Sequence, residues 1–328
     1  MRSRLALLFV LLTVMIDSIG IGIIFPVMPD LLKEVTGADI SQASLWGGLL
    51  ATAFAAMQFL CGPAVGNISD RYGRRPIMLA ALAILAVDYL IMALASSIWL
   101  LLIGRIIAGM AAATYVTANA YVADISPPAE RAQNFGYVGA AFGVGFILGP
   151  ILGGLSADFG PRAPFWLAAA ISAANFLFGY FVLPESLRAE NRRQFELSRA
   201  NPFVAFRAIG KLPGMGRYLV IMFFYMLAFE SYGSVWAFFG AERFGWDAWW
   251  IALSLATYGL SMALVQIFGV APAIRAFGEK RTAAYGMLLD VLAFCFFGFV
   301  TSGALALAFT PIAAAAGVSG PALQGLMA

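Results

Sequence analysis

Residues 66–76 read Gly66-Asn67-Ile68-Ser69-Asp70-Arg71-Tyr72-Gly73-Arg74-Arg75-Pro76, and this short polar link decides the fold. It places one acid, three arginines and two glycines between two apolar runs that are each long enough to cross a bilayer. Such a link must turn the chain sharply at the membrane surface, and its positive charge favours the cytoplasmic side. The sequence around it therefore predicts a membrane protein.

The composition of the whole chain agrees with this prediction. Of the 328 residues, 62% are hydrophobic and only 11% are charged, with a mean hydropathy of +0.88. Soluble domains carry about 25% charged residues, so water cannot be the only solvent of this chain. We therefore predict an all-α integral membrane protein, with about ten spanning helices at 5–27, 43–65, 76–95, 98–122, 134–156, 163–183, 217–240, 249–271, 282–300 and 303–325.

The basic residues are distributed unevenly between the links. The links that hold few of them contain only Lys33, Arg162 and Arg243. This bias predicts a cytoplasmic N-terminus and cytoplasmic basic links. It also explains the central basic run without a nucleic-acid partner. The residues of the basic links are Arg2, Arg4, Arg71, Arg74, Arg75, Arg131, Arg188, Arg192, Arg193, Arg199, Arg207, Lys211, Arg217, Arg275, Lys280 and Arg281.

The start of the chain has two interpretations. A basic tetrapeptide before an apolar run is typical of a signal peptide. This run, however, contains Asp17, continues to about Met28 and shows no clear cleavage site of small residues. We therefore interpret it as the first spanning helix.

The order of the predicted helices indicates two pseudo-symmetric halves. A six-helix half covers 1–184, a cytoplasmic basic linker covers 185–216, and an incomplete half of about four helices covers 217–328. A weak repeat supports this, because residues 271–281 match the first link with Gly278 at the position of Gly73 and Arg275 at that of Asp70. Two more helices would complete the symmetry, so the chain is either a fragment or a protein that lacks part of one half.

Five charged residues fall inside predicted spans, where an ionised side chain is costly. Each should therefore face the bundle interior or a water-filled cavity. For Asp17 with Arg105 we consider two roles, a proton-coupling pair whose separation changes during transport and a static pair that holds helices together. The depth of Glu230 stays open. The five residues are Asp17, Asp88, Arg105, Glu230 and Asp290.

The fifth predicted span contains an unusually dense series of glycines. Their spacing of about one turn lets two helix backbones approach closely, and Pro150 favours a bend. We expect a tight, kinked contact suited to a rocking interface between halves, and the alternative is ordinary membrane packing. The glycines are Gly139, Gly143, Gly149, Gly153 and Gly154.

These stretches together resemble the major facilitator superfamily, a fold of twelve membrane helices. Residues 66–75 resemble its signature loop, 104–109 its fourth-helix motif with Arg105, and 143–154 the fifth-helix motif of its drug antiporters. Residues 17–20 and 26–29 are similar to the first helix of bacterial tetracycline/proton antiporters, and the resemblance extends over essentially the whole chain. It implies a gating role for the loop residues Gly66, Ser69, Asp70, Arg71, Gly73, Arg74 and Arg75.

The resemblance also implies roles inside the membrane. Asp17, Asp88 and Asp290 match acids tied to transport, Arg105 matches an arginine linked to proton coupling, and Gln58 matches a residue near the drug. The antiporter motif comprises Gly143, Gly149, Pro150, Gly153 and Gly154. The chain differs from some family members in having no histidine, with Met262 at the aligned position, and in carrying Glu230 where an uncharged polar residue is usual.

The expected function is therefore a proton-coupled exporter of tetracycline or a similar amphipathic drug in the bacterial inner membrane. We expect no cofactor, no metal site and no enzymatic activity, with the proton as coupling ion and magnesium carried only as part of a tetracycline chelate. The expected partners are the small-molecule drug and the lipid bilayer, for a monomer or a weak homo-oligomer. The alternatives are an antiporter of another drug or metabolite, which Glu230 motivates, and an inactive truncated transporter.

Overall fold

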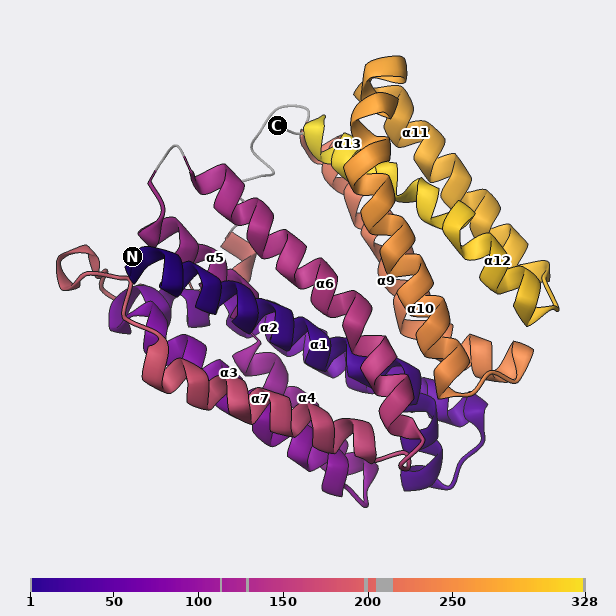
Figure 1. The fold of residues 1–328 in the computed structure, drawn as a ribbon, viewed down its shortest axis with the longest axis horizontal. Coiled ribbons are helices and arrows are strands. Elements are labelled where there is room, and N and C mark those ends of the chain that lie inside the picture. The colour runs from indigo at the N-terminus through magenta and orange to yellow at the C-terminus, as the bar shows by residue number, and fades with distance from the viewer. Residues whose placement is uncertain (1, 113, 128–129, 198–199, 205–214, 327–328) are drawn as a thin grey trace. The chain divides into compact units, whose positions relative to one another are not determined.

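The structure is a computed structural model that describes residues 2–112, 114–127, 130–197, 200–204 and 215–326. Within this described part every regular element is helical, which confirms the predicted all-α class. The chain forms two compact units, Met1–Phe206 and Arg207–Ala328 (Figure 1). The exact limits of the predicted halves and linker stay a prediction.

In its described residues the first unit contains seven longer helices, one short turn of 3₁₀ helix and a helical stretch at 202–204. Two of them, α4 and α5, together occupy the predicted fourth span. They belong to one stretch, Ile98–Ile125, that is long and apolar enough to cross a membrane. The elements are α1 (Arg2–Thr36), α2 (Ile40–Tyr72), α3 (Arg74–Leu94), α4 (Ile98–Ala111), α5 (Thr114–Ile125), α6 (Arg131–Ala157), α7 (Ala163–Val182) and η1 (Ala189–Asn191).

The second unit is also built from helices in its described residues (Figure 1). A π-helical stretch, η2, joins two of its helices, and a 3₁₀ stretch, η3, joins another two. The elements are α9 (Met215–Phe244), α10 (Ala248–Leu264), η2 (Val265–Gly269), α11 (Val270–Phe299), α12 (Gly303–Ala314), η3 (Ala315–Val318) and α13 (Ser319–Gly325).

Nine stretches of the described chain are helical, long and apolar enough to cross a membrane. One of them, Ala248–Phe299, has 52 residues, whereas a single crossing needs about 20. It therefore holds the predicted eighth and ninth spans, and the prediction of about ten membrane helices is confirmed. The expected open link between these two spans was wrong, because the chain stays helical there except at Gly278 (φ 76°, ψ 161°).

The second helix also differs from the prediction. We expected it to end near 65, after Gly62-Pro63, but α2 continues to Tyr72 with Pro63 inside it. Proline is tolerated within membrane helices because neighbouring groups satisfy the freed backbone carbonyl. The polar link of residues 66–76 is thus almost entirely helical, and only Gly73 (φ 111°, ψ 161°) interrupts it.

Short polar residues begin several helices. Asp39 Oδ1 accepts a hydrogen bond from the Gln42 N–H at 2.8 Å, and Asp247 Oδ1 accepts one from the Trp250 N–H at 3.0 Å. These bonds satisfy first-turn N–H groups that have no partner within the helix. The same sequence pattern therefore starts a helix in each unit.

Helix α1 forms the centre of the first unit. It packs against α6 and α7, and α3 packs against α4 and α7. The hydroxyl of Thr13 in α1 donates to Asn175 Oδ1 in α7 at 3.3 Å, and both residues are buried. Polar bonds of this kind join membrane helices where lipid supplies no hydrogen-bond partner. This packing places Asp88 of α3 and Arg105 of α4 in the interior of the first unit.

Candidate functional site

A buried ion pair joins two helices of the first unit. Asp88 of α3 and Arg105 of α4 are in contact, and their residues are only 2% and 8% exposed. The Arg105 guanidinium also lies 5.5 Å from the centre of the Phe54 ring in α2. Gly104 makes room for the pair, because a Cβ there would lie 2.7 Å from Asp88 Oδ1. Our prediction that Arg105 pairs with Asp17 was wrong, since Asp88 is the partner.

Asp17 lies apart from this pair on α1. Its Oδ1 atom is buried and has no hydrogen-bond partner in the described part of the chain. Tyr89, the neighbour of Asp88 in α3, is close enough to interact electrostatically with Asp17 and is fully buried. Gly20, one turn beyond Asp17, packs against the Tyr89 ring. The sequence analysis did not select Tyr89. The signal that could have indicated it is its position directly after Asp88, a predicted membrane acid.

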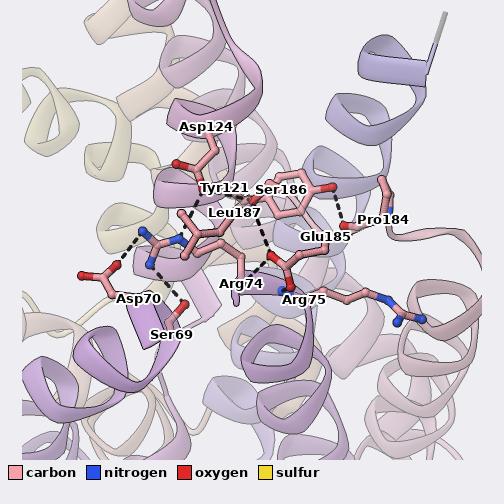
Figure 2. A network of polar contacts seen from close by, with 10 residues as sticks. All are labelled: Ser69, Asp70, Arg74, Arg75, Tyr121, Asp124, Pro184, Glu185, Ser186 and Leu187. Carbon is pink, nitrogen blue, oxygen red and sulfur yellow. Dashed lines mark hydrogen bonds and ion pairs between the residues drawn. The ribbon is translucent and has the colours of Figure 1, made fainter. Parts of the chain in front are cut away.

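The signature loop forms a second cluster, centred on Arg74. Its guanidinium binds Asp70 Oδ1 at 2.6 Å, Asp124 Oδ2 of α5 at 3.3 Å and the Ser69 hydroxyl oxygen at 3.2 Å. Figure 2 shows Arg74 between the two carboxylates. The hydroxyl of Ser186, in the segment that follows α7, donates to the same Asp124 oxygen at 3.0 Å. This arrangement ties the end of α2, the start of α3, α5 and the segment after α7 together.

The other two arginines of the loop do not join Asp70. Arg75 donates to the Tyr180 carbonyl of α7 at 2.7 Å, and its side chain points away from the two aspartates (Figure 2). Arg71 lies over the Tyr72 ring at 5.1 Å. Among the described residues only Arg74 of these three arginines forms an ion pair with Asp70, and the gating role expected for the loop stays a prediction. Gly66 lies within α2, with nothing near its missing side chain.

Glu185 is the main residue of this cluster that the sequence reasoning missed. Its carboxylate accepts hydrogen bonds from the N–H groups of Arg74 at 2.8 Å and Arg75 at 3.3 Å (Figure 2). It thereby caps α3, whose N-cap residue Gly73 has no side chain to do so. The contact is too distant in sequence for a capping motif to show it, because 111 residues separate Glu185 from Arg74.

The glycine series of α6 packs against α1. A Cβ at Gly149 would lie 2.7 Å from the Gly22 Cα, and one at Gly153 would lie 2.6 Å from the Ile23 carbonyl oxygen. Gly145 similarly meets the Met15 carbonyl. The close contact that the glycine spacing predicted is therefore present inside one unit, and the rocking interface between halves stays a prediction. Of the remaining motif residues, Gly143 faces open space, whereas Pro150 and Gly154 are buried.

Asp290 lies in the second unit, in the wall of a cavity of about 370 Å³. It is the one charged residue among the described lining residues, and half of the others are aromatic. Tyr232 is the hub of the aromatic wall, with ring centres 5.8 Å from Tyr258 and 5.7 Å from Phe294. An acid among aromatic rings suits a flat, positively charged ligand.

The cavity lies at the place in the second unit that corresponds to that of α7 in the first unit. It lies between α9 and α11, and the match of Gly278 to Gly73 makes these helices the counterparts of α1 and α3. In the first unit α7 packs against both α1 and α3. The described residues of the second unit include no counterpart of α7. The aromatic lining alone therefore does not identify a drug site.

The last two predicted residues lie outside both clusters. Gln58 of α2 is exposed and donates to the Ala112 carbonyl at the end of α4 at 3.1 Å. Glu230 of α9 is also exposed and is not among the residues that line the cavity of Asp290. The structure therefore does not bring Glu230 and Asp290 into one pocket.

Comparisons with known proteins agree with these features. The profile described as Major Facilitator Superfamily matches residues 10–328. The chain is 41% identical to the "Tetracycline resistance protein, class C" of Escherichia coli, over 100% of this chain and 82% of that protein. It is 37% identical to the class G protein of Vibrio anguillarum, over 99% and 82%. Among solved structures, the "human organic anion transporter MFSD10 (TETRAN)" matches with a TM-score of 0.72 and 26% identity, over 99% of this chain and 85% of that one.

Proposed function

The chain belongs to the Major Facilitator Superfamily, and from this premise we propose that it is a proton-coupled exporter of tetracycline or a similar amphipathic drug. The relatives of this multi-pass membrane protein are transporters rather than enzymes, and we extend that to this chain. We place it in the bacterial inner membrane with a cytoplasmic N-terminus, on the basis of its basic links.

The observation that carries proton coupling is the carboxylate of Asp17 in α1, whose buried Oδ1 atom has no hydrogen-bond partner in the described part of the chain. An unpaired carboxylate inside a membrane protein is costly. Taking up a proton removes the charge, and opening Asp17 to water makes its release possible again. A change in the access of Asp17 can therefore couple proton entry to drug exit.

The two clusters of the first unit have separate parts in this proposal. The Asp88–Arg105 pair keeps α3 and α4 together without a net charge, beside the helix that carries Asp17. The ion pairs of Arg74 hold the ends of α2 and α3 against α5, and we propose that they stabilise a closed cytoplasmic gate. Asp290 supplies a second titratable site in the other unit. A magnesium ion, where present, travels as part of the tetracycline chelate.

A second candidate substrate class has its own support. Glu230 is an exposed acid on α9, and if it faced the transport pathway it would favour a cationic compound. The similar "human organic anion transporter MFSD10 (TETRAN)" is named for another class of substrate. An antiporter of a different drug or metabolite would use the same helices with a different cavity.

Tetracycline uptake into everted membrane vesicles under an imposed proton gradient tests the proposal. We expect gradient-driven uptake by the wild type, and its loss in Asp17→Asn and in Asp290→Asn. The matched control is Asp158→Asn, because Asp158 is an exposed acid at the end of α6 and should tolerate the change. Uptake that persists in both test variants contradicts the proposed coupling. Exchange of protons for another cationic drug but not for tetracycline contradicts the proposed substrate alone.

A further inference from the structure

The segment that follows α7 is attached to the first unit at its very start. The Tyr121 hydroxyl of α5 donates to the Pro184 carbonyl at 2.8 Å, and the Ser186 hydroxyl donates to Asp124 one turn further along α5 at 3.0 Å. Tyr121 is fully buried. Residues 184–196, which we call the strap, therefore begin fixed to α5.

The second attachment is the cap that Glu185 provides for α3. One carboxylate oxygen accepts from the Arg74 N–H and also from the Leu187 N–H of the strap, at 2.8 and 3.0 Å. An acid at a helix N-terminus interacts favourably with the helix dipole as well. Gly73 permits this approach, because a Cβ there would lie 2.7 Å from the Glu185 carboxyl carbon.

The third attachment is to the end of α2. The Arg193 N–H of the strap donates to the Asp70 carbonyl at 3.1 Å, and the Asn67 side chain donates to the Glu196 carbonyl at 2.6 Å. Asn67 is only 6% exposed, so this bond is shielded from water. Both bonds use backbone atoms of the strap. They therefore depend on its path rather than on its own side chains.

Arg74 is consequently held from two directions. Its side chain binds Asp70, Asp124 and Ser69, while its backbone N–H binds Glu185 (Figure 2). A shift of the α3 start would move the guanidinium away from carboxylates that it contacts at 2.6 and 3.3 Å. The ion pairs of the loop thus depend on where the strap lies.

We propose that the strap is a structural part of the cytoplasmic gate, and that Glu185 and Asn67 are positioning residues that set the geometry of Arg74 for transport. This inference rests on the proposed function for its transport consequences, whereas the docking of the strap can be measured without transport. Glu185 acts through the α3 backbone and Asn67 through the strap backbone. Neither needs to contact the drug.

Limited trypsin cleavage of everted vesicles measures docking directly, because Arg188, Arg192 and Arg193 lie in the strap. We expect Glu185→Ala and Asn67→Ala each to increase the rate of cleavage at these sites by about fivefold or more. Glu185→Gln keeps an acceptor and should rescue most of the protection. The matched control is Glu190→Ala, since Glu190 is an exposed strap acid whose partner is Arg188, in the strap itself.

Transport kinetics test the gate role in the same vesicles. With tetracycline as the probe, we expect Glu185→Ala to lower the maximal rate about tenfold and to change KM less than about twofold, because the drug site is untouched. Glu190→Ala should match the wild type. If Glu185→Ala fails to insert into the membrane, the maximal transport rate of Asn67→Ala tests the gate role instead, because this variant leaves the α3 cap intact.

The outcomes separate the two proposals. Unchanged cleavage in both Glu185→Ala and Asn67→Ala overturns the strap proposal, whatever the transport result. Faster cleavage with an unchanged maximal rate overturns the gate role. In a third outcome the two variants are cleaved faster than the wild type, but the wild type itself moves no tetracycline. This outcome supports docking of the strap and contradicts the proposed function.

Discussion

At the scale of single residues, the Asp88–Arg105 pair has the largest predicted effect on stability. Both side chains are buried, and each one neutralises the other. Removing one partner leaves an uncompensated buried charge, which costs about 3–5 kcal/mol of the free energy of unfolding. We therefore expect Asp88→Asn to lower the unfolding free energy, measured by denaturant titration in detergent, by roughly that amount.

Two variants make this prediction specific. The double variant Asp88→Asn with Arg105→Gln should recover most of the loss, because neither charge is then unpaired. Asp30→Asn is the surface control: its pair with Lys33 at 2.8 Å is exposed and is expected to contribute less than about 1 kcal/mol. Equal effects of Asp88→Asn and Asp30→Asn would show that burial does not strengthen the pair.

The pairing of Arg105 also shows what the sequence could and could not predict at this scale. Apolar runs located Asp17, Asp88 and Arg105 inside membrane helices, because an 18- to 20-residue window is enough for that. Choosing between two acids requires the rotation and packing of three helices. Glu185 was beyond reach for another reason, since its partners are backbone N–H groups that every sequence shares.

At the scale of helices, the α1–α6 contact distinguishes glycines that look alike in sequence. A Cβ at Gly149 meets the α1 backbone at 2.7 Å, whereas one at Gly143 meets no atom within 4 Å. We expect Gly149→Ala to force α6 away from α1 and to lower the thermal unfolding midpoint in detergent. Gly143→Ala should leave it unchanged or raise it, because alanine favours a helix over glycine by about 1 kcal/mol.

Equal midpoints for these two alanine variants would refute the role of α1 as the partner. The spacing of the glycines predicted a close helix contact but not its partner, because a spacing of about one turn marks a face without saying what covers it. The glycine motif therefore predicted the close contact of α6 correctly, and the structure identifies α1 as its partner.

At the scale of the whole molecule, the two units repeat one backbone feature. Gly73 and Gly278 have φ of 111° and 76° with the same ψ of 161°, a region that is essentially restricted to glycine. The weak sequence repeat aligned these two glycines, and the backbone supports that alignment. Surrounding charges did not follow the repeat, since Arg275 stands at the position of Asp70 and donates to its own helix at Ala271.

The two glycines should nevertheless differ in importance. Gly278→Ala adds only backbone strain, about 1–3 kcal/mol, because nothing lies within 4 Å of its added Cβ. Gly73→Ala adds the same strain and also displaces Glu185, which removes a helix cap that contributes about 0.5–2 kcal/mol. We therefore expect the larger loss of unfolding free energy for Gly73→Ala. The neutral control is Gly298→Ala, because Gly298 is a helical glycine with open space around it.

In the background of Glu185→Ala the cap is already lost, so the difference in unfolding free energy between the Gly73 and Gly278 variants should shrink. A difference that persists there would mean that the two turns are unequal for a reason other than the strap.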